Sequence, residues 1–236
     1  MNYQCTEESF LKDVEKHEMI IIRDDGIYRH IRFKKENTMM QHFDLITWPG
    51  YLCYTGDMGT YVFTRLRDMF EFFRTDREHR RLRDGLTLAI NPGYWSEKVE
   101  AQDKFDGITE FSEERFKRAV LGDLVQWMRN NRKETDKEDR RDLWQAVMNE
   151  VLGADGDNGG YRQQAAAHDF YHTINSDIRF EFVDFFEHDV TEYSHRFMWC
   201  CYALAWGIEK FDKKKAEPCQ HVVIVADECA LCGAEA

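Results

Sequence analysis

The sequence predicts an α+β fold in which an antiparallel β meander is covered by helices and followed by a mainly helical C-terminal half. Short runs of β-branched and aromatic residues lie before Arg65, separated by the turn signals "DDG", "KKEN", "PG" and "TGDMG". Most of these connections are shorter than the roughly twelve residues of a parallel crossover, so the runs should pair antiparallel. Apolar residues at helical spacing dominate the later part of the chain.

The N-terminal elements begin with a short amphipathic helix. Thr6 can cap this helix, because Glu7 and Glu8 then occupy the first turn, where acids stabilise the positive end of the helix dipole. The predicted strands are Met19 to Ile22, Tyr28 to Phe33, Phe43 to Trp48, Leu52 to Tyr54 and Thr60 to Phe63. A helix that carries Leu66, Met69, Phe70 and Phe73 should then pack across the sheet.

Helices are predicted for most of the remaining chain. "NPGYWSEKVEA" suggests a turn and a short helix, and Ser112 can cap a long helix. Leu143, Val147 and Val151 mark another helix, which ends at the glycine-rich "GADGDNGG". The segment from Tyr193 to Phe211 is apolar on most faces, so we expect it at the buried centre of the C-terminal half.

The chain is accordingly divided into three regions. Residues 1–105 form the sheet with its packing helices, and residues 106–217 form a helical region. Residues 218–236 form a tail, in which "HVVIVADE" predicts a short strand before the last cysteines.

Composition limits the class of protein. The 236 residues can bury a large core, and the formal charge of −12 argues against general binding to nucleic acid, whose phosphates need clustered Lys and Arg. No apolar run reaches the roughly 18 residues of a membrane span, and the N-terminus lacks the apolar region of a signal peptide. Seven cysteines without a regular disulfide spacing favour a reducing compartment, so we expect a cytoplasmic protein.

The segment "TWPGYLCYTGDMGTYVF", Thr47 to Phe63, is the densest run of unusual residues. Its glycines let the backbone adopt positive φ in tight hairpins, so a structural role accounts for it. An acid–base role for Asp57 would need a second titratable partner, and Cys53 is the nearest candidate. We favour the hairpin interpretation.

Two segments suggest metal binding only weakly. "HDFYH" places His168 and His172 four residues apart, the spacing by which one helical face offers two zinc ligands, but Asp169 replaces the usual general-base Glu. The loop "GADGDNGG" starts like a calcium loop but has Ala166 where a bidentate Glu is required, so we reject it. Ordinary histidines remain the favoured interpretation of "HDFYH".

The tail contains the best metal candidate. Cys229 and Cys232 form a C-x-x-C pair followed by glycine, and Cys219 and His221 precede them on one side of an extended chain. These four residues could hold one structural zinc ion, although a single residue between Cys219 and His221 is a short spacing. A redox pair and a tail of free thiols are the alternatives.

Charge is distributed unevenly. From Asp169 to Arg196 there are seven acids against two arginines, whereas Arg65 to Asp84 contains seven arginines against five acids. The acidic stretch also carries phenylalanines that either face the core or provide apolar anchors for a partner. The candidate partner-binding acids are Asp177, Glu181, Asp184, Glu187, Asp189 and Glu192.

Three segments carry a resemblance to a known group. "ITWPGYLCYTGDMGTYVFTRLRDMFEFFR", "NPGYWSEKVEA" and "WCCYALAWGIEKFD" resemble segments of an uncharacterised accessory protein family of proteobacterial temperate phages and prophages. The resemblance runs from about Tyr28 to Asp212 and defines no catalytic residue. It implies a phage accessory gene, a context in which inhibitors of host defence are common.

These observations favour a phage accessory protein that binds a host protein in the cytoplasm of the host cell. An anti-defence inhibitor of the anti-CRISPR or anti-restriction type would use its acidic surface to occupy a groove built for phosphates. The arginines in "REHRRLR", within the arginine-rich segment Arg74 to Arg83, could instead contact an acidic partner or a guide nucleic acid. The alternative from another class is a metal-dependent hydrolase that uses the His-Asp-x-x-His segment.

Overall fold

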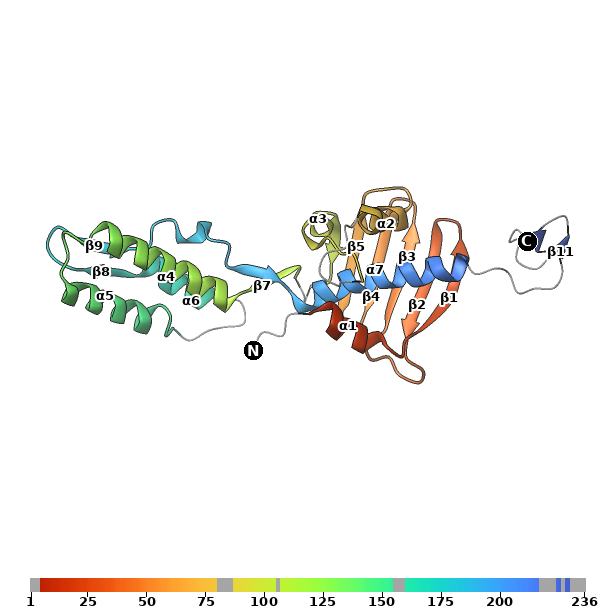
Figure 1. Cartoon of the computed structure of the whole chain (residues 1–236), viewed down its shortest axis with the longest axis horizontal. Helices are drawn as coiled ribbons and strands as arrows, with labels where there is room; N and C mark the ends of the chain where they lie inside the picture. The colour runs from red at the N-terminus through yellow and green to blue at the C-terminus, as the bar shows by residue number, and fades with distance from the viewer. Residues whose placement is uncertain are drawn as a thin grey trace. The chain divides into compact units, whose positions relative to one another are not determined.

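A six-stranded antiparallel meander forms the centre of the N-terminal part of the chain in the computed structural model (Figure 1). The strands pair in sequence order: β1 (Glu18–Asp25), β2 (Tyr28–Lys34), β3 (Phe43–Trp48), β4 (Tyr51–Gly56), β5 (Gly59–Thr64) and β6 (Val99–Gln102). The predicted α+β class and antiparallel meander are therefore confirmed. The sequence did not predict β6, because "EKVEA" contains no run of strand-forming residues.

The chain divides into two compact units. One combines Met1–Ile108 with Ser194–Ala236, and the other is Thr109–Tyr193. We call them the sheet unit and the inserted unit. The structure describes residues 5–79, 87–104, 107–154 and 160–216, together with the backbone of two short paired strands, β11 (Ile224–Val225) and β12 (Glu228–Cys229).

Tight turns join the central strands. Trp48 pairs with Tyr51 and Gly56 with Gly59, so each hairpin between β3 and β5 has a two-residue turn. Gly50 (φ 86°) and Gly59 (φ 95°) adopt left-handed conformations that a side chain would strain. The segment "TWPGYLCYTGDMGTYVF" therefore forms two consecutive hairpins, as the sequence predicts.

One face of the sheet carries the core of the sheet unit. It is formed by the fully buried side chains Ile31, Phe33, Phe43, Leu45, Leu52, Tyr54, Tyr61 and Phe63. Helix α7 (His195–Ala216) crosses this face, with α1 (Glu7–Val14) beside it (Figure 1). Trp199 of α7 makes edge-to-face contacts with Phe10 of α1 and Phe43 of β3, at ring-centroid distances of 4.9 and 5.5 Å.

Two further helices extend this layer. Phe73 of α2 (Met69–His79) contacts both Phe63 of the sheet and Trp95 of α3 (Pro92–Ser96), at centroid distances of 5.4 and 4.8 Å. The predicted short helix in "NPGYWSEKVEA" is thus confirmed by α3. Thr6 caps α1 as expected, since its hydroxyl accepts the amide hydrogen of Ser9 at 3.2 Å.

The position of α7 differs from the sequence-based division. The prediction grouped this helix with a helical region over residues 106–217, whereas it packs on the sheet. A helix that is apolar on most faces needs apolar neighbours on most sides, and the sheet face with α1 and α2 supplies them. Gly207 permits the close approach, because a Cβ atom there would lie 3.0 Å from Leu45 Cδ1 and 3.1 Å from Phe33 Cε2.

The inserted unit is a small α+β domain of its own. It contains β7 (Thr109–Phe111), α4 (Glu113–Asn130), α5 (Lys137–Glu150), α6 (Tyr161–Asp169), β8 (Tyr171–Thr173), β9 (Arg179–Glu181), the 3₁₀ turn η1 (Phe185–Glu187) and β10 (Thr191–Tyr193). Strand β7 pairs with β10, and β8 pairs with β9, both antiparallel. The predicted Ser112 cap of α4 is confirmed.

The core of the inserted unit is rich in phenylalanine. Its buried residues include Phe116, Val120 and Leu124 of α4, Leu143 and Val147 of α5, and Phe170, Phe180, Phe182 and Phe185. The chain leaves the sheet unit at Ile108 and returns at Ser194, whose amide donates to the Ile108 carbonyl at 2.9 Å. The two points at which the insertion begins and ends are therefore adjacent.

Candidate functional site

The six acids predicted to bind a partner all belong to the inserted unit. The side chains of Asp177, Glu181, Asp184, Glu187 and Asp189 are exposed, and that of Glu192 is half-buried. This unit contains 19 acids and 11 basic residues, a net charge of −8 out of the −12 of the whole chain. The acidic character recognised in the sequence is thus concentrated in one unit.

Not all of these carboxylates are available to a partner. Asp189 accepts hydrogen bonds from the hydroxyl and amide of Thr191 at 2.8 and 3.1 Å and from Arg115 at 2.9 Å. These bonds, led by those from Thr191, lower the pKa of Asp189. Glu181 pairs with Arg179 at 2.9 Å. Asp189 and Glu181 are therefore partly engaged within the unit.

Three of the four phenylalanines in the acidic stretch face the core. Phe180, Phe182 and Phe185 are at most 7% exposed, whereas Phe186 is 62% exposed. The core interpretation is thus right for three of them and wrong for Phe186. Val183 nearby is 71% exposed, so the stretch displays two apolar side chains.

The exposed side chains belong to one short segment, residues 183–187, which we call the 183–187 turn. Phe185 anchors it by packing edge-on against Phe116 of α4 at 5.6 Å. Asp184 adopts a left-handed conformation (φ 52°), and its carbonyl accepts the Glu187 amide at 2.9 Å. The ring of Phe186 lies 5.0 Å from that of His168 on α6. The turn is therefore held by the core while its outer side chains face solvent.

The carboxylates of the 183–187 turn have no ion-pair partner among the residues that the structure describes. Asp184 and Glu187 alternate with Val183 and Phe186, so apolar and negative groups are displayed together on one turn. Sequence reasoning selected both acids but could not identify the exposed phenylalanine. Only the packing of Phe185 decides which neighbour faces outward.

The predicted two-histidine helix does not form. Helix α6 ends at Asp169, Phe170 is extended, and His172 lies in β8 opposite Phe180. The ring nitrogen Nδ1 of His168 lies 2.8 Å from the Asp169 carboxylate. The prediction that the two histidines share a helical face is wrong, because the helix stops when Phe170 turns into the core. Among the described residues, no group of three or more His, Cys, Asp or Glu side chains could hold a metal ion.

The predicted zinc ligands fall mostly outside the described residues. Cys219, His221 and Cys232 lie there, and of Cys229 only the backbone, in β12, is described. Strand β11 within "HVVIVADE" pairs with β12. A zinc site formed by these four residues remains a prediction from the sequence.

Asp57 and Cys53 have the surroundings of structural residues. Asp57 lies in the β4–β5 turn, where its carboxylate accepts the amide hydrogen of Gln41 at 2.9 Å and its own amide donates to the His42 carbonyl. Burial raises the pKa of the Cys53 thiol, which disfavours the nucleophilic thiolate. Neither residue has the environment of a catalytic group.

Sequence reasoning missed an ionic cluster on the sheet. Asp44 of β3 is 5% exposed and accepts two hydrogen bonds from Arg32 at 2.8 Å, with His30 Nε2 at 2.7 Å. Burial by itself would raise the pKa of Asp44, but the bonds from Arg32 and His30 outweigh it and lower the pKa. Alternation places His30 and Arg32 on one face of a strand, but only the register brings Asp44 beside them.

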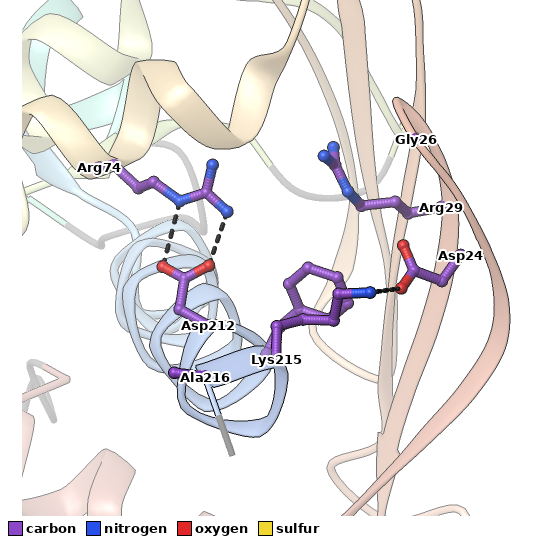
Figure 2. A pocket seen from close by; sticks show the side chains of 8 residues that line it. Asp24, Gly26, Arg29, Arg74, Asp212, Lys215 and Ala216 are labelled. Atoms are coloured by element: carbon purple, nitrogen blue, oxygen red, sulfur yellow. Dashed lines mark hydrogen bonds and ion pairs between the residues drawn. The ribbon is translucent and has the colours of Figure 1, made fainter. Parts of the chain in front are cut away.

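A hollow of about 530 Å³ lies in the sheet unit beside the C-terminal end of α7 (Figure 2). Arg74 of α2 makes two hydrogen bonds to Asp212 of α7, and Lys215 pairs with Asp24 of β1 at 2.9 Å. Figure 2 shows these two ion pairs across the hollow. Arg74, at one end of the arginine-rich segment, is therefore engaged, and Arg80 to Arg83 lie outside the described residues.

Arg29 completes the lining of this hollow. Its guanidinium makes two hydrogen bonds of 2.8 Å to Asp68 and lies over the ring of Phe70 at 4.7 Å. Burial favours a raised pKa for Asp68, but the bonds from Arg29 lower it. Each of the three cations of the hollow faces a carboxylate, so the charges balance. We interpret these pairs as links between the sheet, α2 and α7.

Comparisons with known proteins add no assignment. No protein family, curated protein or solved structure matches the chain. Within the described residues, none of the helices has the length and apolar character needed to cross a membrane. The 183–187 turn, with its exposed apolar and acidic side chains, is therefore the candidate site that the geometry itself supports.

Proposed function

We propose that this protein binds a host protein with a basic surface through the 183–187 turn, as an inhibitor of a host defence system encoded by a phage or prophage. The observation that carries the proposal is the exposure of Phe186 and Val183, at 62% and 71%, beside the carboxylates of Asp184 and Glu187, which have no ion-pair partner among the described residues. The resemblance to phage and prophage proteins supports the biological setting.

The physical basis is an apolar anchor within a negative surface. An exposed aromatic side chain that is buried at the centre of an interface can contribute about 2 kcal/mol or more to binding. The turn is already ordered by Phe185 and by the Asp184 conformation, so little entropy is lost when it docks. The net charge of −8 of the inserted unit then accelerates encounter with a basic partner.

The class of partner follows from the same charges. A groove lined by Arg and Lys that normally receives phosphates would accept carboxylates, and an apolar pocket at its edge would receive Phe186. Defence proteins that bind nucleic acid have such grooves. Inhibition then follows from competition for the groove.

The test compares variants of the turn in purification of partners from host lysate. Phe186→Ala removes the anchor, and Asp184→Asn with Glu187→Gln removes the charges, while asparagine retains the left-handed conformation of residue 184. Glu150→Lys, at an exposed position of α5, is the control for a change of charge in the same unit. We expect one host protein to bind the wild type and the control but neither turn variant.

Binding of the purified partner then separates the two contributions. Phe186→Ala should weaken binding about 30-fold or more without changing its salt dependence. The neutralised pair should weaken binding at low salt and flatten the salt dependence. Thermal stability should be unchanged in both. A partner that binds all variants equally across the salt range would contradict the proposal.

A further inference from the structure

The sheet has a second face that the core does not use. From β2 to β5 it is formed by the residues that alternate with the core: Tyr28, His30, Arg32, Lys34, Asp44, Ile46, Trp48, Tyr51, Cys53, Thr55, Thr60, Val62 and Thr64. Apart from Asp44, every one of these residues is half-buried or exposed. We call this surface the open face.

Three aromatic residues cross one end of the open face. Trp48 of β3 pairs with Tyr51 of β4 in the ladder, and their rings stack at a centroid distance of 5.3 Å with 16° between the planes. Tyr28 of β2 lies one residue beyond the last β2–β3 pair, Arg29 with Thr47, on the side where Trp48 follows Thr47, and its ladder partner in β1 is Asp25. Tyr28 and Trp48 are 43% and 36% exposed. We call Tyr28, Trp48 and Tyr51 the aromatic row.

One arginine contacts the aromatic row, and two others follow β5 close to the turn that joins Trp48 to Tyr51. The guanidinium of Arg23 lies 5.2 Å from the ring centroid of Tyr28. Arg65 directly follows Thr64, the ladder partner of Tyr51. The carbonyl of Arg67 accepts the amide hydrogen of Gly50, in the turn that joins Trp48 to Tyr51. The backbone of residues 65–67 therefore lies at the end of the sheet that carries the aromatic row.

These cations are more available than those of the hollow. The side chains of Arg65 and Arg67 are exposed, and neither has an acid partner among the residues that the structure describes. Arg23 pairs with Asp25, the ladder partner of Tyr28, and both side chains are more than half exposed, so water screens that pair. The buried acid of the open face, Asp44, is already neutralised by Arg32 and His30.

The overall charge of −12 does not describe this surface. The sheet unit has 25 acids and 21 basic residues, a net charge of −4, because the inserted unit holds the rest of the excess. Local clusters of cations determine contact with phosphates, whatever the total. The composition argument against nucleic acid therefore applies to the inserted unit more than to this end of the sheet.

We propose that the aromatic row and its arginines bind single-stranded nucleic acid. Bases stack on exposed aromatic rings whatever their sequence, and Arg65, Arg67 and Arg23 neutralise the phosphates. The row crosses three strands spaced about 4.8 Å apart, a width that fits about two or three bases. A duplex hides its base faces, so a flat sheet surface favours the single strand.

Cross-strand packing alone does not account for the arrangement. Stacking between Trp48 and Tyr51 stabilises the hairpin. This stabilisation does not require Tyr28 to be exposed. It also does not require Arg65 and Arg67 to be exposed without an acid partner among the described residues. A protein-binding surface would also use aromatic residues. The charge of these arginines selects a polyanion over a neutral peptide.

The test measures binding of the full chain to fluorescent oligothymidylate and oligouridylate of about 15 nucleotides, with a duplex of equal length for comparison. Trp48→Ala should weaken single-strand binding about 5- to 100-fold, whereas Trp48→Phe, which keeps a stacking ring, should bind close to the wild type. Circular dichroism of each variant checks the fold.

The arginines have their own readout. Arg65→Gln with Arg67→Gln should reduce the slope of log K against log salt by about 1.4, since each phosphate contact to a single strand contributes about 0.7. Arg129→Gln with Arg132→Gln, at exposed positions of the inserted unit, is the matched control and should leave the slope unchanged.

Three results would overturn the proposal. The first is failure of the wild type to bind single strands at about 100 µM, the weak limit of non-specific binding. The second is wild-type binding by both Trp48→Ala and the double arginine variant, and the third is binding of the duplex as tight as that of the single strand. If Trp48→Ala instead abolishes binding of a protein while no oligonucleotide binds, the open face is a protein-docking surface.

Discussion

The sheet unit and the inserted unit differ in how the chain builds their cores. The sheet unit joins two distant segments, because Trp199 of α7 packs on Phe10 of α1 and Phe43 of β3. The inserted unit is built from one continuous segment whose ends meet where β7 pairs with β10. Helix α7 therefore completes the sheet unit only after the chain has passed through the inserted unit.

The two units also differ in their surfaces. The inserted unit is strongly acidic and exposes Phe186 beside Asp184 and Glu187, whereas the sheet unit is nearly balanced and exposes the aromatic row and the side chains of Arg65 and Arg67. All seven cysteines belong to the sheet unit. The chain thus carries an acidic surface on the inserted unit and an aromatic–basic surface on the sheet unit. For each surface we propose a partner of the opposite charge.

The largest effect is expected from removal of the inserted unit. If residues 109–193 are replaced by an Asn-Gly turn, Ile108 and Ser194 can remain paired, since Asn-Gly suits a two-residue hairpin. Binding of a host protein through the 183–187 turn should be lost completely, while oligonucleotide binding persists. Circular dichroism and a cooperative melting curve test the shortened chain. An unfolded product would show that the sheet unit depends on the insertion.

The next largest effect is expected from removing one large core side chain from each unit. Trp199→Ala in the sheet unit and Phe180→Ala in the inserted unit should each cost about 3–5 kcal/mol, since both side chains are at most 1% exposed. Trp199→Ala also removes the indole donor to Asp13. Urea unfolding followed by circular dichroism should show that each variant shifts a different transition. A single transition that both variants shift equally would refute independent folding.

A third prediction uses the distribution of cysteines. Burial raises the pKa of Cys200 and Cys201 well above the usual 9.0, so both thiols stay neutral in the folded sheet unit. Their contribution to stability is fully present below about pH 9 and is lost as pH rises further, because the unfolded chain ionises first. The free energy of unfolding of the sheet unit should therefore be lower at pH 10 than at pH 8.

The control for this pH effect is the pair Cys200→Ala and Cys201→Ala. This variant should be less stable at pH 8 but lose less stability between pH 8 and pH 10 than the wild type does. The inserted unit, which has no cysteine, lacks this contribution. An unchanged pH dependence in the variant would show that other groups are responsible.

The smallest effect compares one ion pair from each unit. Asp44→Asn should cost about 1–2 kcal/mol, because a buried carboxylate loses its charge-assisted bonds to Arg32 and His30. Asp189→Asn should cost about 0.5 kcal/mol or less, because the side chains of Asp189 and Arg115 are 70% and 45% exposed and water screens the pair. Denaturant unfolding measures both.

The lowered pKa of Asp44 adds a pH signature. Its stabilising contribution is present above the ordinary pKa of 3.8 and is lost as pH falls below that value. Asp44→Asn should therefore reduce the acid sensitivity of the sheet unit. Equal acid sensitivity in the variant and the wild type would show that Asp44 does not contribute to the loss of stability in acid.

Local features of the fold could be predicted from the sequence. The runs of β-branched and aromatic residues became β1 to β5, and the Pro49–Gly50 and Asp57–Met58 turns joined them as expected. Thr6 and Ser112 cap helices as predicted. These features depend on residues close together in the chain, so the sequence contains the physical cause.

Features that depend on distant residues could not be predicted in this way. His172 was expected on a helix and lies in a strand, because burial of Phe170 ends α6. The Asp44 cluster and the aromatic row depend on strand register, which hydrophobic alternation alone does not specify.

The sequence by itself determined the α+β class, the antiparallel meander and the acidic stretch, because turn chemistry, alternation and charge are local properties of the chain. The position of α7 depends on tertiary packing. The helix is apolar on most faces and could be buried in more than one place, and it packs on the apolar face of the sheet. The same holds for two neighbouring rings: Phe185 is buried against Phe116 of α4, while Phe186 faces solvent.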